Sequence, residues 1–458
     1  MTTEDPASAV DIAAIIDDLP LKSFHVVLLI GCALLALSDG YDIAVIGFAG
    51  PSLVREWHIA NLASLAPAFS AGLFGVLIGA PIFGFVGDRF GRKITLTVSA
   101  IFFGVFSLLT MAAGSLEQMI ALRFFTGIGL GGVLPTTLAL AAEYAPRKYK
   151  LTFGVVVTVG ILLGAALPGP VAAWLVPTHG WSILFLIGGI MPIALAIILY
   201  PFLPESLKFL SLHPGRHSSL VLLVSRLRPD LAVNSSTQFV APEVDRKIGR
   251  SLKNLFAGDL AILTPLLWVC FLISQMCNFF FQTWLPTLIA SAGYPPTQAA
   301  LSYTWFQLGG VIAAILISRP LEKIGFVSVA IFFAGGIPAV AALGYIFGSG
   351  EIQSALSLMA AGLCLTGLLI TMLAIAGAIY PTPIRSSGIG WTFALGRCGG
   401  VFGPIIGGLL VSLHLSTPQL FAAAAVPLVV GLIASIAFCW VYSARNKTFV
   451  IKEAVALH

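Results

Sequence analysis

The chain has 458 residues, of which 58% are hydrophobic and only 9% are charged. Soluble domains carry about 25% charged residues, so this composition excludes a water-soluble enzyme of this size. At about 20 residues per membrane crossing, the length accommodates about twelve helices joined by short loops. The composition therefore predicts an all-α protein that crosses a membrane many times.

The N-terminal residues 1–22 form an acidic segment that lacks the positively charged start of a secretory signal peptide. We expect this segment to be a cytoplasmic tail rather than a cleaved leader. The six cysteines lie within apolar runs, and no two of them form a CxxC pair. They are interpreted as small buried side chains, so neither a metal nor another cofactor is expected.

Twelve apolar runs follow this tail, and their spacing predicts two bundles. Six runs fill residues 23–203, a polar central loop occupies 204–259, six more runs fill 260–443, and a short tail ends the chain at 444–458. Apolar runs of about 18 residues or more are the strongest sequence signal for membrane helices. A weak internal repeat suggests that the halves are related, because four residues recur at one spacing: Tyr144, Gly154, Gly164 and Pro168 reappear as Tyr380, Gly390, Gly400 and Pro404.

The lysines and arginines are distributed very unevenly among the loops. Of the 24 in the chain, Arg123 and Arg397 fall within spans and Arg55 alone falls in one alternate set of loops. All the others lie in the opposite set, which contains both tails and the central loop. The positive-inside rule therefore predicts that both termini and the central loop are cytoplasmic.

Two aspartates lie inside the first span, where a charged side chain is costly. Asp39 and Asp42 are three residues apart and so share one helix face. Two such close carboxylates cannot both ionise cheaply, so one is expected to accept a proton near neutral pH. Both are candidates for proton coupling, and the alternative is that they only pair with Arg123.

Arg123 near the start of span four and Arg397 in the middle of span eleven are the two cations within spans. The glycines that follow Arg123 allow a neighbouring helix to approach closely, which favours an interior guanidinium over one that reaches to the outer interface. The second half has no acidic residue within its spans to pair with Arg397. Its partner is therefore expected to arrive as a substrate carboxylate, which arginine binds with two hydrogen bonds.

An amide-rich face on span seven suits a ring that carries a polar substituent. Gln275, Asn278 and Gln282 lie at helical spacing with aromatic residues beside them. The alternative is interhelical hydrogen bonding. The candidate substrate site consists of Arg123, Arg397, Gln275, Asn278, Gln282, Phe279, Tyr303, Gln307 and Trp391.

The turn between spans two and three combines glycines with charges. Gly87 and Gly91 permit a tight turn, and Asp88 is expected to cap the helix that follows. Glu143, at the end of span four, and Arg385, before span eleven, lie on the same predicted side. The predicted cytoplasmic gate consists of Gly87, Asp88, Arg89, Gly91, Arg92, Glu143 and Arg385.

The string Gly87-Asp-Arg-Phe-Gly-Arg-Lys93 resembles the signature loop of the major facilitator superfamily, and Pro204-Glu-Ser-Leu-Lys-Phe-Leu210 resembles a second superfamily pattern. Asp39-Gly-Tyr-Asp42, the stretch around Arg123, and Gly396-Arg397 resemble the aromatic acid:proton symporters, which include 4-hydroxybenzoate and benzoate carriers. The resemblance implies the major facilitator fold and links Asp39, Asp42 and Arg123 to proton-coupled transport. Thr136 stands where that family often has asparagine, which leaves a substrate other than a typical hydroxybenzoate open.

The function predicted from these features is proton-coupled import of an aromatic, benzoate-like carboxylic acid by alternating access in a bacterial inner membrane. Expected partners are the organic acid, the proton and membrane lipids, without nucleic acid, and a monomer is expected. The alternatives are an efflux antiporter, a symporter for another organic anion, and a transporter-like sensor. An enzyme is not expected, because the spans contain no cluster of a nucleophile and a base, and the chain lacks the ATP-binding sequence GxxxxGK[ST].

Overall fold

The computed structural model describes residues 10–17, 19–231, 233–234, 237–240, 252–316, 325–346, 350–381 and 384–445. Within these ranges, twelve helical segments are long and apolar enough to cross a membrane, which confirms the predicted number of spans. Parts of the predicted tails, residues 1–9 and 446–458, lie outside the described residues, as does 241–251 of the central loop.

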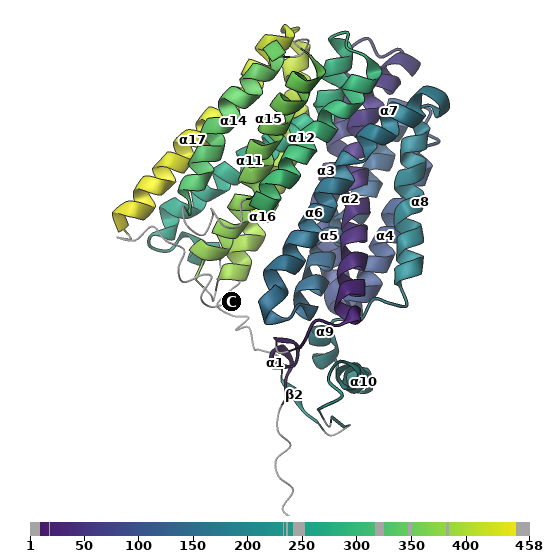
Figure 1. The fold of residues 1–458 in the computed structure, drawn as a ribbon, viewed down its shortest axis with the longest axis vertical. Helices are drawn as coiled ribbons and strands as arrows, with labels where there is room; N and C mark the ends of the chain where they lie inside the picture. The colour runs from purple at the N-terminus through teal and green to yellow at the C-terminus, as the bar shows by residue number, and fades with distance from the viewer. Residues whose placement is uncertain are drawn as a thin grey trace, which may run out of the picture.

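The helices form two groups of six spans (Figure 1). The first group comprises α2 (Ser23–Glu56), α3 (Ala66–Phe90), α4 (Arg92–Thr110), α5 (Leu116–Tyr144), α6 (Lys150–Ala166) continued by α7 (Pro168–His179), and α8 (Ser182–Leu199). The second group comprises α11 (Leu260–Ser291), α12 (Pro296–Leu316), α14 (Val327–Ile346), α15 (Glu351–Ile379), α16 (Arg385–Ser412) and α17 (Thr417–Arg445).

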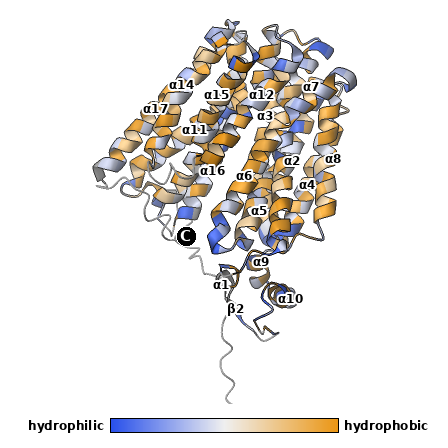
Figure 2. Cartoon of the chain, viewed as in Figure 1, coloured by the Kyte–Doolittle hydropathy of each residue, from blue (hydrophilic) through white to orange (hydrophobic). Residues whose placement is uncertain are grey.

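The two groups use the same helix pairings. In the first group α2 packs on α6, α3 on α5 and α4 on α8; the corresponding pairs in the second group are α11 with α16, α12 with α15 and α14 with α17. The weak sequence repeat therefore corresponds to a structural repeat. Figure 2 shows hydrophobic residues over most of the length of these helices, as expected for surfaces that face lipid.

Short elements gather at the lower end of the first group in Figure 1. They are α1 (Ile12–Asp17), α9 (Leu207–Ser211), α10 (His217–Leu227) and a two-stranded parallel sheet of β1 (Val10–Asp11) and β2 (Phe239–Val240). Short 3-10 turns occur at several places along the chain, at Leu62–Leu65, Arg147–Tyr149, Pro214–Arg216 and Leu252–Phe256. Ile15 and Ile16 are buried in the same apolar cluster as Leu220 and Val224 of α10. Helices α1 and α10 are thus packed together beneath the first group.

The two groups contact one another in the upper part of the helices. Phe48 of α2 meets Tyr303 of α12 edge-on, with ring centroids 6.0 Å apart, and Phe69 of α3 meets Trp284 of α11 at 5.1 Å. A hydrogen bond also joins the two groups at the break in span five, between α6 and α7 just before Pro168. There the Thr304 hydroxyl donates to the carbonyl oxygen of Ala166 at 2.9 Å, which satisfies an acceptor exposed by the break.

Candidate functional site

Asp42 and Arg123 form an ion pair in the interior of the first group. The Arg123 Nη2 atom lies 2.6 Å from Asp42 Oδ2 and 2.8 Å from the Asp42 carbonyl oxygen, and Nη1 lies 3.3 Å from Oδ1. The two side chains are 2% and 0% exposed, so Arg123 does not reach to the surface. Ser107 of α4 donates a further hydrogen bond to Asp42 Oδ1 at 2.7 Å. Asp42 is therefore fully committed to partners in its own half.

Glycines on α5 allow this ion pair to be enclosed. A Cβ atom at Gly127 would overlap the carbonyl oxygen of Gly72 on α3, and one at Gly129 would press on Phe103 of α4. Both neighbouring helices consequently pack directly against the α5 backbone. This close approach excludes lipid and water from the guanidinium of Arg123, as the glycine pattern predicts.

Asp39 has a different environment from Asp42, although both lie on α2. It is 1% exposed, and its Oδ1 atom has no hydrogen-bond partner among the described residues. Its charge interacts with Arg397 of α16 across the boundary between the groups and is repelled by Asp42. Asp39 is thus a buried carboxyl group that forms no ion pair among the described residues and is attracted by a charge of the other half of the protein.

The opposite charge that acts on Arg397 comes from the first half of the chain, so a count of acidic residues in the second half does not reveal it. The sequence leads to the expectation of an unpaired guanidinium, and Arg397 forms no ion pair among the described residues, but the charge of Asp39 on α2 attracts it. Residues three apart on a helix point about 60° apart around its axis, so Asp42 can face α5 while Asp39 faces the other group. Arg397 itself is only partly buried.

The three amides of α11 are buried, and one of them lies beside the neighbour of Arg397. Gln275, Asn278 and Gln282 are 8%, 8% and 5% exposed. The side chain of Gln275 lies against Gly396, the residue that precedes Arg397. Asn278 donates to the Thr366 hydroxyl of α15 at 3.4 Å, a long contact. The amides are therefore buried, the bond of Asn278 is of the interhelical kind that the sequence left open, and their role as a substrate face stays a prediction.

The remaining predicted substrate residues divide into two sets. Phe279 packs on Gly400 of α16, Tyr303 is buried against Phe48, and Gln307 is 3% exposed with an Oε1 atom that has no partner among the described residues. Trp391 instead is 42% exposed and lies 6.4 Å from Trp268, ring to ring. Trp391 therefore differs from the other members in being exposed, and its place in the substrate site stays a prediction.

The loop between α3 and α4 is organised by a residue from the central loop. The Oε1 atom of Glu205 accepts hydrogen bonds from the backbone N–H of Arg92 at 2.6 Å and of Lys93 at 3.2 Å. Glu205 thus caps α4, and the expectation that Asp88 does so is wrong. Asp88, in the last turn of α3, instead pairs with the side chain of Arg92, the first residue of α4, at 3.0 Å. Gly91 has a φ of 100°, and a Cβ there would overlap the Glu205 carboxylate.

The other predicted gate residues are only partly brought together. Glu143 lies close enough to Arg92 for their charges to attract, and its Oε2 atom has no hydrogen-bond partner among the described residues. Arg89 is exposed beside Phe90, and Gly87 is buried against the Arg92 guanidinium. Arg385 belongs to the second group, where its Nε atom donates to the carbonyl oxygen of Tyr380 at 3.2 Å.

Sequence reasoning missed two residues of these clusters. Glu205 lies within the Pro204–Leu210 pattern, which pointed to this segment but not to its contact with α4. Ser107 stands in an apolar run without any distinguishing neighbour, and only packing identifies it as a partner of Asp42. A serine in a membrane helix commonly bonds to its own backbone, so no sequence signal selects it.

Comparisons with known proteins agree with this architecture. The profile of the Major Facilitator Superfamily matches residues 32–360 and 267–455. The chain is 33% identical to the 4-hydroxybenzoate transporter of Acinetobacter baylyi over 445 residues, which is 95% of this chain and 96% of that protein. It is 33% identical to a gallate transporter of Pseudomonas putida over 91% of this chain and 92% of that protein.

The fold is also that of a solved structure. The xylose transporter of E. coli in a partially occluded inward open conformation matches with a TM-score of 0.68 and 18% identity, covering 92% of this chain and 98% of that one. At this identity the likeness concerns the fold alone. Together with the sequence matches over nearly the whole chain, it establishes that the protein belongs to the Major Facilitator Superfamily, in the group that contains these 4-hydroxybenzoate and gallate transporters.

Proposed function

We propose that this protein imports an aromatic, benzoate-like carboxylic acid together with a proton, by alternating access across a bacterial inner membrane. The observation that carries the proposal is the 33% identity, over more than 90% of the chain, to transporters named for 4-hydroxybenzoate and gallate. Both of those compounds are aromatic carboxylates. The buried charges of α2, α5 and α16 are consistent with this class of substrate, because they offer a cation for the carboxylate and a carboxyl group for the proton.

The placement of Lys and Arg supports an orientation with both termini inside the cell. In this orientation residues 1–22, 204–259 and 444–458 are cytoplasmic, and 23–203 and 260–443 form the two bundles. The lower end in Figure 1, with α9 and α10, is then the cytoplasmic end. The contacts of Phe48 with Tyr303 and of Phe69 with Trp284 close the outer end and have to separate when the site opens outward.

Arg397 is the proposed ligand of the substrate carboxylate. It lies in the middle of α16, is partly accessible, and has the amide of Gln275 beside its helix. The unpartnered Oε1 atom of Gln307 is available for a hydroxyl substituent on the ring. Arg123 is less suited to this task, because Asp42 already occupies its guanidinium.

Asp39 is the proposed proton carrier, and its attraction to Arg397 suggests how the two ligands are coupled. While Asp39 is ionised, its charge attracts Arg397 and opposes the binding of a second carboxylate there. Protonation of Asp39 removes that charge, so the substrate anion binds more tightly, and by linkage the bound anion favours the protonated form. The proton and the acid then cross together. Asp42 is the weaker candidate for proton transfer, because its carboxylate is already bound by Arg123 and Ser107.

The central prediction concerns Arg397. Replacing Arg397 by alanine should weaken binding of the acid by about 10- to 150-fold, because a charged hydrogen bond contributes about 1.5 to 3 kcal/mol. Arg397→Lys should weaken it less, since lysine keeps the charge but not the paired geometry. Calorimetric Kd values for the acid and for its uncharged amide test this. Equal weakening for both ligands would show that Arg397 does not contact the carboxylate.

The cluster of Asp88, Arg92, Glu143 and Glu205 is proposed to bias the conformational equilibrium. These residues lie at the cytoplasmic end and hold α3, α4 and the central loop together. Asp88→Asn should lower the transport rate and change the Kd for the acid by no more than the shift in conformational populations, because Asp88 lies outside the predicted substrate site. Parallel measurements of the uptake rate and of equilibrium binding test this, and a matching loss in both would argue against a gating role.

Uptake into proteoliposomes tests the function itself. Labelled 4-hydroxybenzoate and benzoate should accumulate against their gradients when the outside is acidic, and an uncoupler should abolish accumulation. Acetate and other small aliphatic acids should compete poorly. Acid-driven extrusion from the cytoplasmic side would instead indicate an efflux antiporter, and accumulation of aliphatic acids only would indicate a symporter for another organic anion.

A further inference from the structure

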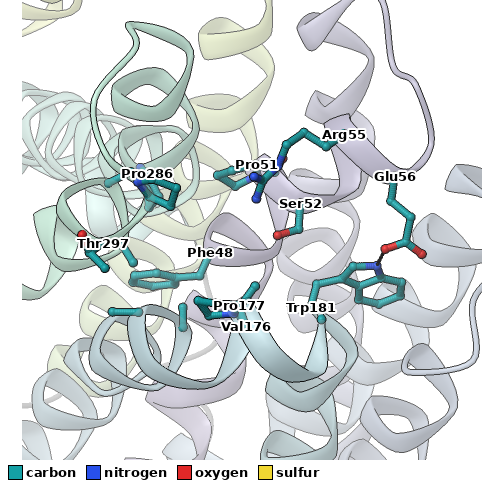
Figure 3. Close-up of a pocket in the computed structure, with 16 residues that line it drawn as sticks. Phe48, Pro51, Ser52, Arg55, Glu56, Val176, Pro177, Trp181, Pro286 and Thr297 are labelled. Atoms are coloured by element: carbon teal, nitrogen blue, oxygen red, sulfur yellow. Dashed lines mark hydrogen bonds between the residues drawn. The ribbon is translucent and has the colours of Figure 1, made fainter.

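The outer end of the protein contains a cavity of about 460 Å³ between the two groups of helices (Figure 3). Phe48 and Pro51 of α2 and Val176 of α7 line it from the first group, and Pro286 and Pro296 line it from the second. Its volume falls within the range of sites that bind small organic molecules, about 300 to 1,000 Å³. Its walls are mainly apolar, so the few polar groups at its edge determine which ligands it suits.

Arg55 is the basic residue at this cavity. Figure 3 shows its side chain beside Pro51, above Ser52. Its Nε atom donates to the Pro51 carbonyl oxygen at 3.3 Å, while its terminal nitrogens have no hydrogen bond or ion pair with any described residue. The neighbouring Glu56 also lines the cavity, but it forms no ion pair with Arg55; its Oε2 atom accepts the indole N–H of Trp181 at 2.7 Å. The terminal nitrogens of Arg55 remain available for an anion.

A basic residue at the position of Arg55 is not expected from the membrane topology. It is the one Lys or Arg of the chain in the predicted outer loops, where the positive-inside rule leaves basic residues scarce. Its side chain is exposed, so it does not stabilise the interior. A guanidinium at the edge of an apolar slot, with the hydroxyls of Ser52 and Thr297 on the lining, suits a flat apolar ring that carries one carboxylate.

We propose that this outer cavity is a second binding site for the aromatic carboxylate, which captures the acid from the medium before the central site opens outward. The proposal rests on the proposed function. The ring would lie on Phe48 and the prolines, with the carboxylate at Arg55. Phe48 also contacts Tyr303, so it separates this cavity from the predicted central site. Separation of the two groups at the outer end therefore connects the two sites.

The test compares Arg55→Gln and Arg55→Lys with the wild type in proteoliposomes of neutral lipid, using labelled 4-hydroxybenzoate. For uptake from the outer side, Arg55→Gln should raise KM about two- to fivefold at low salt with little change in kcat, the range of an exposed charge pair. Arg55→Lys should keep KM close to the wild-type value, because lysine retains the charge. High salt should reduce the difference in KM between Arg55→Gln and the wild type. For transport from the cytoplasmic side, KM should not change. Arg226→Gln, an exposed charge on α10, is the matched control and should match the wild type.

Three outcomes would overturn the proposal. One is an unchanged outer KM in Arg55→Gln. Another is an equal change on both sides, which would indicate a general effect on the conformational cycle. The third is an effect that is present only in anionic lipid, which would show that Arg55 binds a lipid phosphate. If the wild type takes up no aromatic acid at all, the proposed function fails and this inference fails with it.

Discussion

Asp39→Asn should abolish accumulation of the aromatic acid against its gradient while leaving exchange of internal for external acid largely intact. Asparagine has nearly the shape of a protonated aspartate but cannot release a proton, so the cycle loses its coupling step. It also no longer competes with the substrate for Arg397, to which Asp39 is electrostatically linked. Equilibrium binding of the acid should therefore become independent of pH in the range where the wild type responds. Uptake, counterflow and Kd at several pH values measure the three quantities.

Asp39→Glu is the matched control for this experiment. It retains a titratable carboxyl group at the same place, so some pH-driven uptake should return, although the longer side chain shifts its distance from Arg397. Full pH-driven accumulation by Asp39→Asn would contradict the assignment. If Asp42→Asn gave selective loss of uphill uptake in a stably folded protein, Asp42 would be the coupling residue instead.

Breaking the Asp42–Arg123 ion pair should produce the largest loss of stability among these variants. Both side chains are buried, at 0% and 2% exposure, so removing either charge leaves the other without compensation. Such a loss costs about 3 to 5 kcal/mol in buried pairs of this kind. Asp42→Asn and Arg123→Gln should each lower the thermal unfolding temperature in detergent and reduce the folded yield.

The double variant Asp42→Asn/Arg123→Gln tests whether the cost belongs to the pair. With both charges removed, no uncompensated charge remains, so the double variant should be more stable than either single variant. Ser107→Ala is a milder comparison, because it removes one hydrogen bond at 2.7 Å and leaves the ion pair intact. Additive losses in the double variant would mean that Asp42 and Arg123 act independently.

Much of the fold could be predicted from the sequence, for a local reason. A helix in lipid has to satisfy its backbone hydrogen bonds within its own segment, so each span appears as an apolar run that can be counted without knowledge of its neighbours. The twelve spans of residues 23–203 and 260–443 are determined in this way. The loop Gly87–Lys93 and the segment Asp39–Asp42 also indicated the family, because short motifs are visible in one stretch of chain.

Only the tertiary structure decided which charges face one another. Asp39 and Asp42 look equivalent in the sequence, yet Asp42 bonds to Arg123 of α5, while Asp39 is attracted by Arg397 of α16. Glu205 rather than Asp88 caps α4. These contacts join residues that are distant along the chain, and they depend on how helices rotate and cross when glycines let their backbones meet. The sequence therefore determined the spans and the family, whereas helix packing determined the pairing of charges from which we infer the coupling mechanism.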